Sequence, residues 1–544
     1  MIGGLWSYPI SVTSSDPSRR SDLEVERLFI VLAVAFLITV LVRTAWLADD
    51  AAIELRVVEN FVAGNGLRWN VAERVQAYSD PLWVLLLSAI DFFERQPYLS
   101  AWAVSLVLTA VAALAIAFRL AADAAAGMIA LALLIFSKAF VEYSVSGFQT
   151  PLTVMLLAAF WIAYWKRPPG AGRLTALAFL AGLLVLTDPL GVVLVLPGLV
   201  VAASRVDRRT RVRAIAIGAA PAAAWLVFAA VYYGFLLPNT ATAALHSRAA
   251  PGEMLLQGSY YFLDGLNSDP VAVATIAGAL TAAAFGMIDD CGPLAIGIVT
   301  FVAVLVATGG DALSGRSLVP PFASAVILLT RYRWRQIGDF LAIPAAVVVA
   351  LGLTAPASPV LADADFGKDV AAWNRWPGDP APKPTEANHI RDERRLSYQM
   401  TGLLKGQRYV PLPDTSAAEA TVNTALATGR HVVVEETVGL LGVVAGPRLH
   451  VIDRLARGDV LLARLRPRDR WRPGGAPREL PRGYLQSRES GSNVIDDPVT
   501  SRYFDALSIV TSGPLFSRDR IRAMVDVNLG RLARLRHAAV YACD

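Results

Sequence analysis

The chain has 544 residues, of which 55% are hydrophobic and only 17% charged, and its mean hydropathy is +0.47. Soluble domains carry about 25% charged residues, so this composition excludes an ordinary soluble protein and favours a membrane protein. The net charge is +5. The arginine clusters that supply it lie between apolar runs, which is typical of membrane loops and argues against a nucleic-acid partner.

Hydropathy divides the chain into three parts. Residues 1–27 are polar, residues 28–355 form a series of apolar runs, and residues 356–544 are charged and rich in proline. The first run, 28–47, is too long for a signal peptide and no small-residue cleavage site follows it, so it predicts a retained helix. We therefore expect a cytoplasmic N-terminus, a transmembrane domain, and a soluble tail long enough to bury its own core.

The apolar runs predict a polytopic α-helical membrane protein. A helix that spans lipid needs roughly 20 apolar residues, and run 80–93 is short enough to be re-entrant or half-length. The sequence LTDPLG predicts a break at Asp188-Pro189, because proline cannot continue a helix. We expect about 11 transmembrane helices plus the short one. The candidate runs are 28–47, 80–93, 98–118, 120–140, 149–165, 173–187, 188–204, 212–235, 269–288, 292–308, 317–330 and 337–355.

Lysine and arginine predict the orientation. Residues before the first run, and the basic segments 165–173, 205–213 and 331–335, should be cytoplasmic. The tail and the loops that alternate with these segments should then lie outside the plasma membrane, in the periplasm of a two-membrane cell. These outer loops are 48–79, 142–148, 236–268 and 309–316. In the tail, residues 431–444 indicate strand and turn and 520–542 a terminal helix, so an α/β or α+β soluble domain is expected.

The first outer loop begins with two adjacent acids, Asp49 and Asp50. The residues after them have helical periodicity, with apolar side chains on one arc and Arg56 on the other. This pattern predicts a helix over 51–63 that lies on the membrane surface. One aspartate before a helix is an ordinary N-cap. A cap needs one carboxylate, and the second acid is a candidate general base.

The stretch DDAAIELRVVENFVAGNGLRWNVAERVQAYSDPLW resembles the first outer loop of the terminal arabinofuranosyltransferases of the mycobacterial cell envelope. Further matching stretches follow in the order found in that family, and most lie in the predicted outer loops. They are SVSGFQTPL (144–152), GFLLPNTATAAL (234–245), SYYFLDGLNSDP (259–270), GGDALSGRSLVPP (309–321), GPRLHVIDRLARGDVLLARL (446–465) and PRGYLQS (481–487).

The resemblance implies a membrane glycosyltransferase of the GT-C class. Such enzymes move a sugar, typically arabinofuranose, from a polyprenyl-phosphate donor to a hydroxyl of a cell-envelope glycan, with inversion of the anomeric centre. A carboxylate of the first outer loop, here Asp49 or Asp50, deprotonates the acceptor. The preferred assignment makes Asp49 the base and lets Asp50 bind the acceptor or cap the helix. The leaving group is already a phosphate, so cationic or hydrogen-bonding groups suffice to stabilise it.

Other candidates for substrate contact each have an alternative interpretation. Arg56 either faces the donor phosphate or snorkels to lipid head groups. Asp80, where the family usually has histidine, is a candidate acceptor contact, and Asn239 either serves the donor site or forms a turn. Arg316 is at an outer membrane edge, where a phosphate needs a cation, and Asp311 is placed to orient it; the alternative is an exposed turn whose arginine snorkels to lipid head groups.

Departures from the family pattern leave a second function open. Ala52 replaces an aromatic residue, Gln149 replaces a glutamate, and the lysine expected after PNT is absent. A flagellar motor control protein also resembles this family, so a non-catalytic role in envelope assembly or motility is the alternative. No protein partner follows from the sequence.

No cofactor or protein-bound zinc is expected, and dependence on a divalent metal ion is left open by the sequence. There is neither a G-x-G-x-x-G motif nor a P-loop, and the two cysteines, Cys291 and Cys543, form no metal motif. The histidines have no metal-ligand spacing: His246, His389, His431, His450 and His537.

Overall fold

A computed structural model describes residues 17–246, 250–355, 358–361, 388–405, 412–467, 471 and 473–532. Parts of the expected cytoplasmic N-terminus, soluble tail and terminal helix, with His537 and Cys543, lie outside these residues. The chain forms two compact units. Unit 1 consists of Met1–Trp46, Trp102–Ala220 and Gly252–Leu412, and unit 2 consists of Leu47–Ala101, Pro221–Pro251 and Pro413–Asp544. Both units contain residues from either side of 356, and the domain boundaries inferred from hydropathy stay a prediction.

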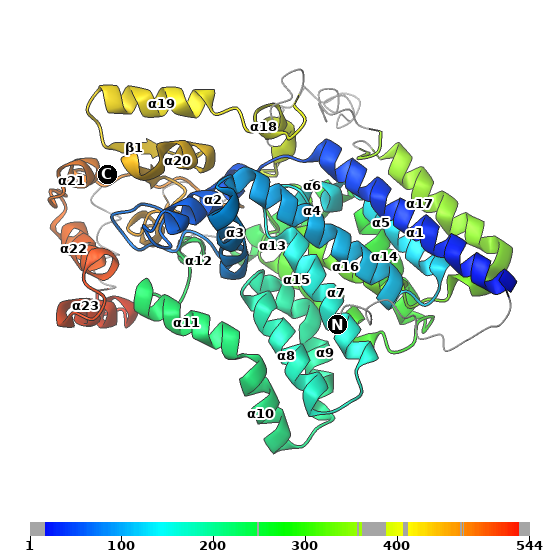
Figure 1. Cartoon of the computed structure of the whole chain (residues 1–544). Coiled ribbons are helices and arrows are strands. Elements are labelled where there is room, and N and C mark those ends of the chain that lie inside the picture. Colours follow the sequence, from blue (N-terminus) through cyan, green and yellow to red (C-terminus); the bar gives the residue numbers. More distant parts are fainter. Residues whose placement is uncertain are drawn as a thin grey trace. The chain divides into compact units, whose positions relative to one another are not determined.

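Unit 1 is a bundle of apolar helices (Figure 1). Within it α1 packs on α5, α8 on α7 and α10, α9 on α15, and α14 on α16. The predicted break is present, because α8 ends at Val185 and the Asp188 carboxylate caps a short turn before α9. The helices are α1 (Pro17–Thr44), α4 (Pro97–Ala115), α5 (Ala124–Phe136), α6 (Lys138–Tyr143), α7 (Thr150–Lys166), α8 (Ala171–Val185), α9 (Val192–Ser204), α10 (Arg208–Gly218), α13 (Pro251–Ser268), α14 (Pro270–Ala284), α15 (Gly292–Ala307), α16 (Val319–Leu329), α17 (Ala342–Thr354) and α18 (Glu393–Thr401).

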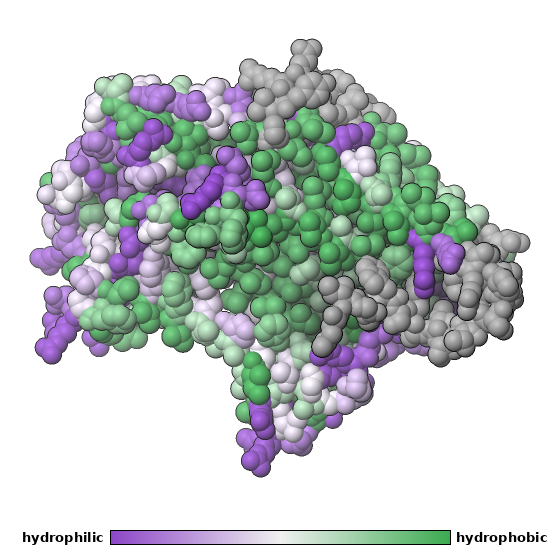
Figure 2. Space-filling model, in the orientation of Figure 1, coloured by the Kyte–Doolittle hydropathy of each residue, from purple (hydrophilic) through white to green (hydrophobic). Residues whose placement is uncertain are grey.

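The chain is that of a polytopic helical membrane protein. Among the described residues, the apolar parts of two helices, Glu24–Thr44 and Pro97–Leu120, are long enough to cross a membrane. A third span exists if α10 and the following helix are one broken span, and several further apolar helices have 10–17 residues. Figure 2 shows hydrophobic residues covering the surface over α4, α7 and α8. The number of full spans and the GT-C architecture stay predictions.

Unit 2 combines the first predicted outer loop with the C-terminal part of the chain. Its two strands pair in parallel, from Val432 opposite His450 to Glu435 opposite Asp453. The helix α20 follows β1, where the sequence had indicated only strand and turn. The elements are α2 (Asp49–Val62), α3 (Pro81–Glu94), α11 (Ala220–Tyr232), α12 (Asn239–Leu245), α19 (Ser416–Ala427), β1 (Val432–Glu435), α20 (Gly439–Ala445), β2 (His450–Asp453), α21 (Tyr484–Ser490), α22 (Pro498–Ser512) and α23 (Arg518–Asn528).

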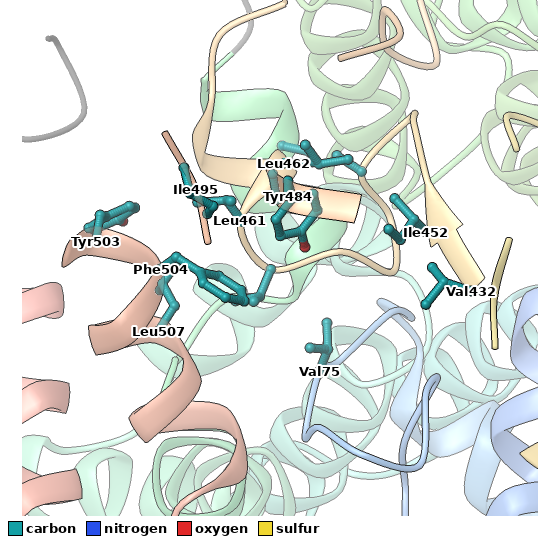
Figure 3. Close-up of a cluster of buried hydrophobic side chains, with 14 residues drawn as sticks. Val75, Val432, Ile452, Leu461, Leu462, Tyr484, Ile495, Tyr503, Phe504 and Leu507 are labelled. Atoms are coloured by element: carbon teal, nitrogen blue, oxygen red, sulfur yellow. The ribbon is translucent and has the colours of Figure 1, made fainter. Parts of the chain in front are cut away.

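The core of unit 2 joins segments that are far apart in the sequence. Figure 3 shows Val75 of the first loop beside side chains from the strands, from α21 and from α22. A second cluster packs Ile53 and Trp69 against α19 and α20. The first loop is therefore part of the same hydrophobic core as the tail, and burial of these side chains stabilises both together.

The helix after the two acids does not lie on a membrane surface. α2 begins at Asp49, close to the predicted start, but most of its side chains, polar ones included, are buried. It packs on α20 and α3. Asn60, on the arc expected to face water, instead donates hydrogen bonds to the carbonyls of Arg68 and Trp69. The periodicity was correct, but the polar arc faces loops of the protein.

Candidate active site

Asp49 joins α2 to α20. Its Oδ2 accepts a hydrogen bond from the Gly439 amide at 3.0 Å, and its Oδ1 accepts one from the Leu440 amide at 3.1 Å. These amides lie in the first turn of α20, whose N–H groups have no partner within the helix. Asp49 is thus a cap, but of a helix almost 400 residues away rather than of its own. Burial raises the pKa of Asp49, and Asp50 raises it further, against the effects of Arg457 and the two amides.

Asp50 is held by an arginine of the C-terminal part. Arg457 pairs through Nη1 with Asp50 Oδ1, and through Nε, at 3.1 Å, with Oδ2 of the fully buried Asp453. Burial alone would lower the pKa of Arg457, but Asp453 and Asp50 outweigh it and raise the pKa, so the guanidinium is a permanent cation. The Asp50 side chain keeps 27% of its surface exposed. Asp50 therefore offers an oriented carboxylate that a substrate can reach.

The loop that carries Arg457, residues 453–459, is fixed from several directions. Asp453 Oδ2 accepts hydrogen bonds from the amides of Arg457 and Gly458, both within the loop. Trp69 packs so closely on Gly458 that any side chain there would overlap its ring. Such a fixed loop places the guanidinium before any substrate arrives, which is the requirement for electrostatic preorganisation.

Asn239 holds the same loop from another segment. Its amide nitrogen donates to the carbonyls of Ala456 at 2.8 Å, Arg457 at 3.1 Å and Asp459 at 2.9 Å. Its amide oxygen accepts from Arg464 at 3.4 Å. These bonds give Asn239 a positioning role toward Arg457, in place of the donor contact or simple turn expected from the sequence.

Arg56 is buried rather than open to a phosphate. Its Nη2 donates to the carbonyls of Gly446 and Leu449, each at 3.0 Å, and its guanidinium lies 4.3 Å from the Trp69 ring centre. Burial lowers the pKa of Arg56 from its ordinary value to about 9. Neither snorkelling nor phosphate contact fits this environment, and Arg56 instead fastens α2 to the tail.

Asp80 is also buried. It precedes α3, which begins with Pro81, and only 1% of its surface is exposed. A direct acceptor contact, as expected from the sequence, would require this region to open.

A small pocket in unit 2 is lined by residues of the first loop, the segment after α11 and the tail: Arg74, Val75, Gln76, Tyr233, Phe235, Leu237, Asn239, Val460 and Arg464.

In unit 1, Asp311 orients Arg316 as the sequence suggested. Arg316 donates to both carboxylate oxygens of Asp311, from Nε at 2.8 Å and from Nη2 at 2.9 Å. Ser317 donates to the same carboxylate at 2.6 Å, and the Arg316 guanidinium lies 5.0 Å from the Phe148 ring centre. About a third of the arginine side chain, 34%, is still exposed. Arg316 is thus a rigid, accessible cation.

Comparison with known proteins adds two sequence relatives. The terminal β-(1→2)-arabinofuranosyltransferase of Mycobacterium tuberculosis is 28% identical over 435 residues, which cover 70% of this chain and 67% of that protein. The protein of the same name from Corynebacterium glutamicum is 29% identical over 339 residues, covering 52% of this chain and 47% of that protein. The chain is a relative of the terminal arabinofuranosyltransferases. The resemblance inferred from the outer-loop motifs is confirmed.

No protein-family model matches the chain. Among solved structures, the crystal structure of ArnT from Cupriavidus metallidurans bound to undecaprenyl phosphate is similar to this chain, at 14% sequence identity and a TM-score of 0.44. The match covers 80% of this chain and 76% of the ArnT chain. That score is too low to argue a common fold. Within the described ranges, no group of three or more His, Cys, Asp and Glu side chains is arranged to hold a metal ion. The expectation of no cofactor or protein-bound zinc stays a prediction.

Relationship to the arabinofuranosyltransferases did not by itself identify Arg457 or Asp453. Both lie in the stretch HVIDRLARGD, which resembles the family, but no spacing argument connects them to Asp50. The sequence signal that could have indicated these residues is the group Asp453, Arg457 and Asp459 next to a glycine, directly after an apolar pattern typical of a strand. Only the fold shows that this strand end meets the start of α2.

Glu59, near the end of α2, allows a test of this buried arrangement. Burial and the neighbouring Asp91 raise its pKa from 4.5 to about 7, despite the opposing charge of Arg56. The folded state then binds more protons than the unfolded state between these values, so stability falls as pH rises from about 4.5 to about 7. We expect Glu59→Gln to raise the melting temperature at pH 8 and to leave it unchanged at pH 4. An equal effect at both pH values would contradict the raised pKa.

Proposed function

We propose that this protein is an inverting glycosyltransferase that uses a polyprenyl-phosphate sugar, most simply an arabinofuranose, and a cell-envelope glycan hydroxyl outside the plasma membrane. The observation that carries the proposal is the oriented, accessible Asp50 carboxylate, which lies in the stretch that resembles the first outer loop of the arabinofuranosyltransferases. A carboxylate fixed in this way is suited to general-base catalysis.

In the proposed reaction, Asp50 accepts the proton of the acceptor hydroxyl as its oxygen attacks the anomeric carbon of the donor. The bond between that carbon and the phosphate oxygen breaks, and its electron pair leaves with the polyprenyl phosphate. Arg457 holds the carboxylate in place, while Asp49 keeps the start of α2 against α20. The structure favours Asp50 over Asp49 as the base, because both Asp49 oxygens already accept backbone amides.

Arg316 is proposed to bind the donor phosphate, because it is a partly exposed cation held by a bidentate pair with Asp311. A hydrogen bond to a charged group contributes about 1.5–3 kcal/mol. We therefore expect Arg316→Gln to raise the KM for the lipid donor by about 10-fold to 100-fold, with little change in the KM for the acceptor. The measurement is initial-rate kinetics with each substrate varied in turn. Arg391→Gln, which removes a partly exposed arginine from the segment beside this loop, is the control.

The direct experiment uses the purified full chain in lipid with synthetic polyprenyl-phospho-arabinofuranose and an arabinan acceptor. We expect a glycan lengthened by one residue with inverted anomeric configuration, detected by mass spectrometry and NMR. If the protein binds neither this donor nor another polyprenyl-phospho-sugar, the proposed function is wrong. A non-catalytic role in envelope assembly or motor control would then be the better hypothesis.

A further inference from the structure

The last described helix, α23, exposes a row of large apolar side chains. At 100° per residue, Ile521, Val525 and Leu529 fall within a single 80° arc of the helix or its immediate extension. All three are exposed, as is Phe516 just before the helix. Scattered apolar residues on a surface are ordinary, but a continuous row marks a surface that contacts another apolar phase.

α23 is fastened to the end of α11. The buried Arg520 donates to the carbonyls of Val231 at 2.9 Å and Tyr232 at 3.0 Å, in the last turn of α11. Asn528 donates to the Gly234 carbonyl at 2.9 Å. The terminal carbonyls of α11, which have no partner within that helix, are thus bound by α23. Figure 1 shows the two helices meeting at this end.

α11 has the character of a membrane segment up to this point. It is the second half of the candidate broken span, and its Leu226, Val227, Phe228 and Val231 are exposed. The two leucines that follow, at 236 and 237, are exposed as well. Figure 2 shows hydrophobic surface over α11. If α11 is in lipid, α23 lies at the level where that helix leaves the hydrocarbon.

The charges on α23 match a layer of lipid phosphates. Arg518 and Arg522 are exposed; Arg518 falls within the apolar arc, between Val525 and Leu529, and Arg522 lies just beyond the Leu529 edge of the arc. Asp526 and Asp519 lie farther round the helix on the same side. Arginines within and beside a row of exposed apolar side chains are typical of interfacial helices. A second copy of the chain would meet these arginines with its own, so lipid is the better occupant.

We propose that α23 lies on the lipid surface at the membrane end of α11. Ile521, Val525 and Leu529 enter the boundary between head groups and acyl chains, and Arg518 and Arg522 bind phosphates of anionic lipids. The C-terminal part of unit 2 is then fixed at the bilayer by a contact of its own.

The test places a spin label at Val525→Cys, and in a matched protein at Asp519→Cys on the same helix. Both variants are made in the full chain after replacement of Cys291 and Cys543 by alanine, and each is reconstituted in nanodiscs that contain phosphatidylglycerol. We expect the ratio of oxygen to nickel-chelate collision rates to be at least about five-fold higher at 525 than at 519, because oxygen concentrates in lipid and the chelate does not.

Two outcomes would overturn the proposal. Equal ratios at the two positions would mean that water covers the row. Low collision rates with both reagents at 525 would mean that protein covers it, as in a dimer. If the row lies on lipid, exchange of anionic for zwitterionic lipid should weaken the contact by about five-fold for each arginine. The double variant R518Q/R522Q should lose this dependence on lipid charge.

Discussion

Replacement of Asp50 by asparagine is expected to abolish sugar transfer while leaving the fold intact. Asparagine keeps the shape and an oxygen that can accept from Arg457, but it cannot take a proton from the acceptor hydroxyl. Loss of a general base costs about 10²-fold to 10⁴-fold in rate. The measurement is kcat with polyprenyl-phospho-arabinofuranose, together with the melting temperature of each protein in the same lipid.

Asp49→Asn is the matched control at the neighbouring position. It replaces a carboxylate that accepts two backbone amides, so we expect a lower melting temperature and at most an indirect loss of rate. Leaving one buried amide without its acceptor costs about 1–3 kcal/mol. If Asp49→Asn abolishes transfer in a fully folded protein and Asp50→Asn does not, the base is Asp49. Full activity in both variants would remove the acid pair from catalysis.

The second large effect is expected from Gly439→Ala. At this position a methyl group would overlap the backbone carbonyl of Asp49, which cannot move away as a flexible side chain can. Overpacking of this kind costs about 1–3 kcal/mol and occasionally more. It would also pull the Asp49 carboxylate from the amides of α20. We expect a lower melting temperature, measured by differential scanning fluorimetry, and reduced transfer because Asp50 follows directly in the chain.

Gly252→Ala provides the comparison for that variant. Gly252 lies in the first turn of α13, and an added methyl group there has open space around it. Its melting temperature should therefore match that of the parent protein or exceed it slightly. A similar loss of stability in both variants would show that the contact between α2 and α20 is not tight.

Much of the helical order was predictable from hydropathy and breakers, including the start of α2 and the interruption at Asp188-Pro189. Periodicity could not show what faces the polar side of α2. An arc that contains Arg56 and Asn60 is the same in sequence whether it meets water or loop carbonyls. The sequence therefore predicted the boundaries of α2 closely, but it did not predict that protein loops, and not water, contact its polar arc.

The candidate site was predictable only where its residues are close in sequence. Asp311 and Arg316 are five residues apart around a glycine turn, and their pairing was foreseen. Asp50 pairs with Arg457, 407 residues later, and Asp49 accepts hydrogen bonds from two backbone amides of α20, which no side-chain pattern reveals. Long-range packing of Trp69 against Gly442 and Gly458 brings these segments together.

The same packing restricts how this protein can be recombined with its relatives. A chimera that exchanges the first outer loop alone would place a foreign α2 against a native α20 and a native Arg457. Asp49, Asp50 and Trp69 each contact specific partners between residues 439 and 458. A functional chimera should therefore take the first outer loop and residues 439–458 from the same parent protein. Substitutions in one segment should therefore be accompanied by changes in the other.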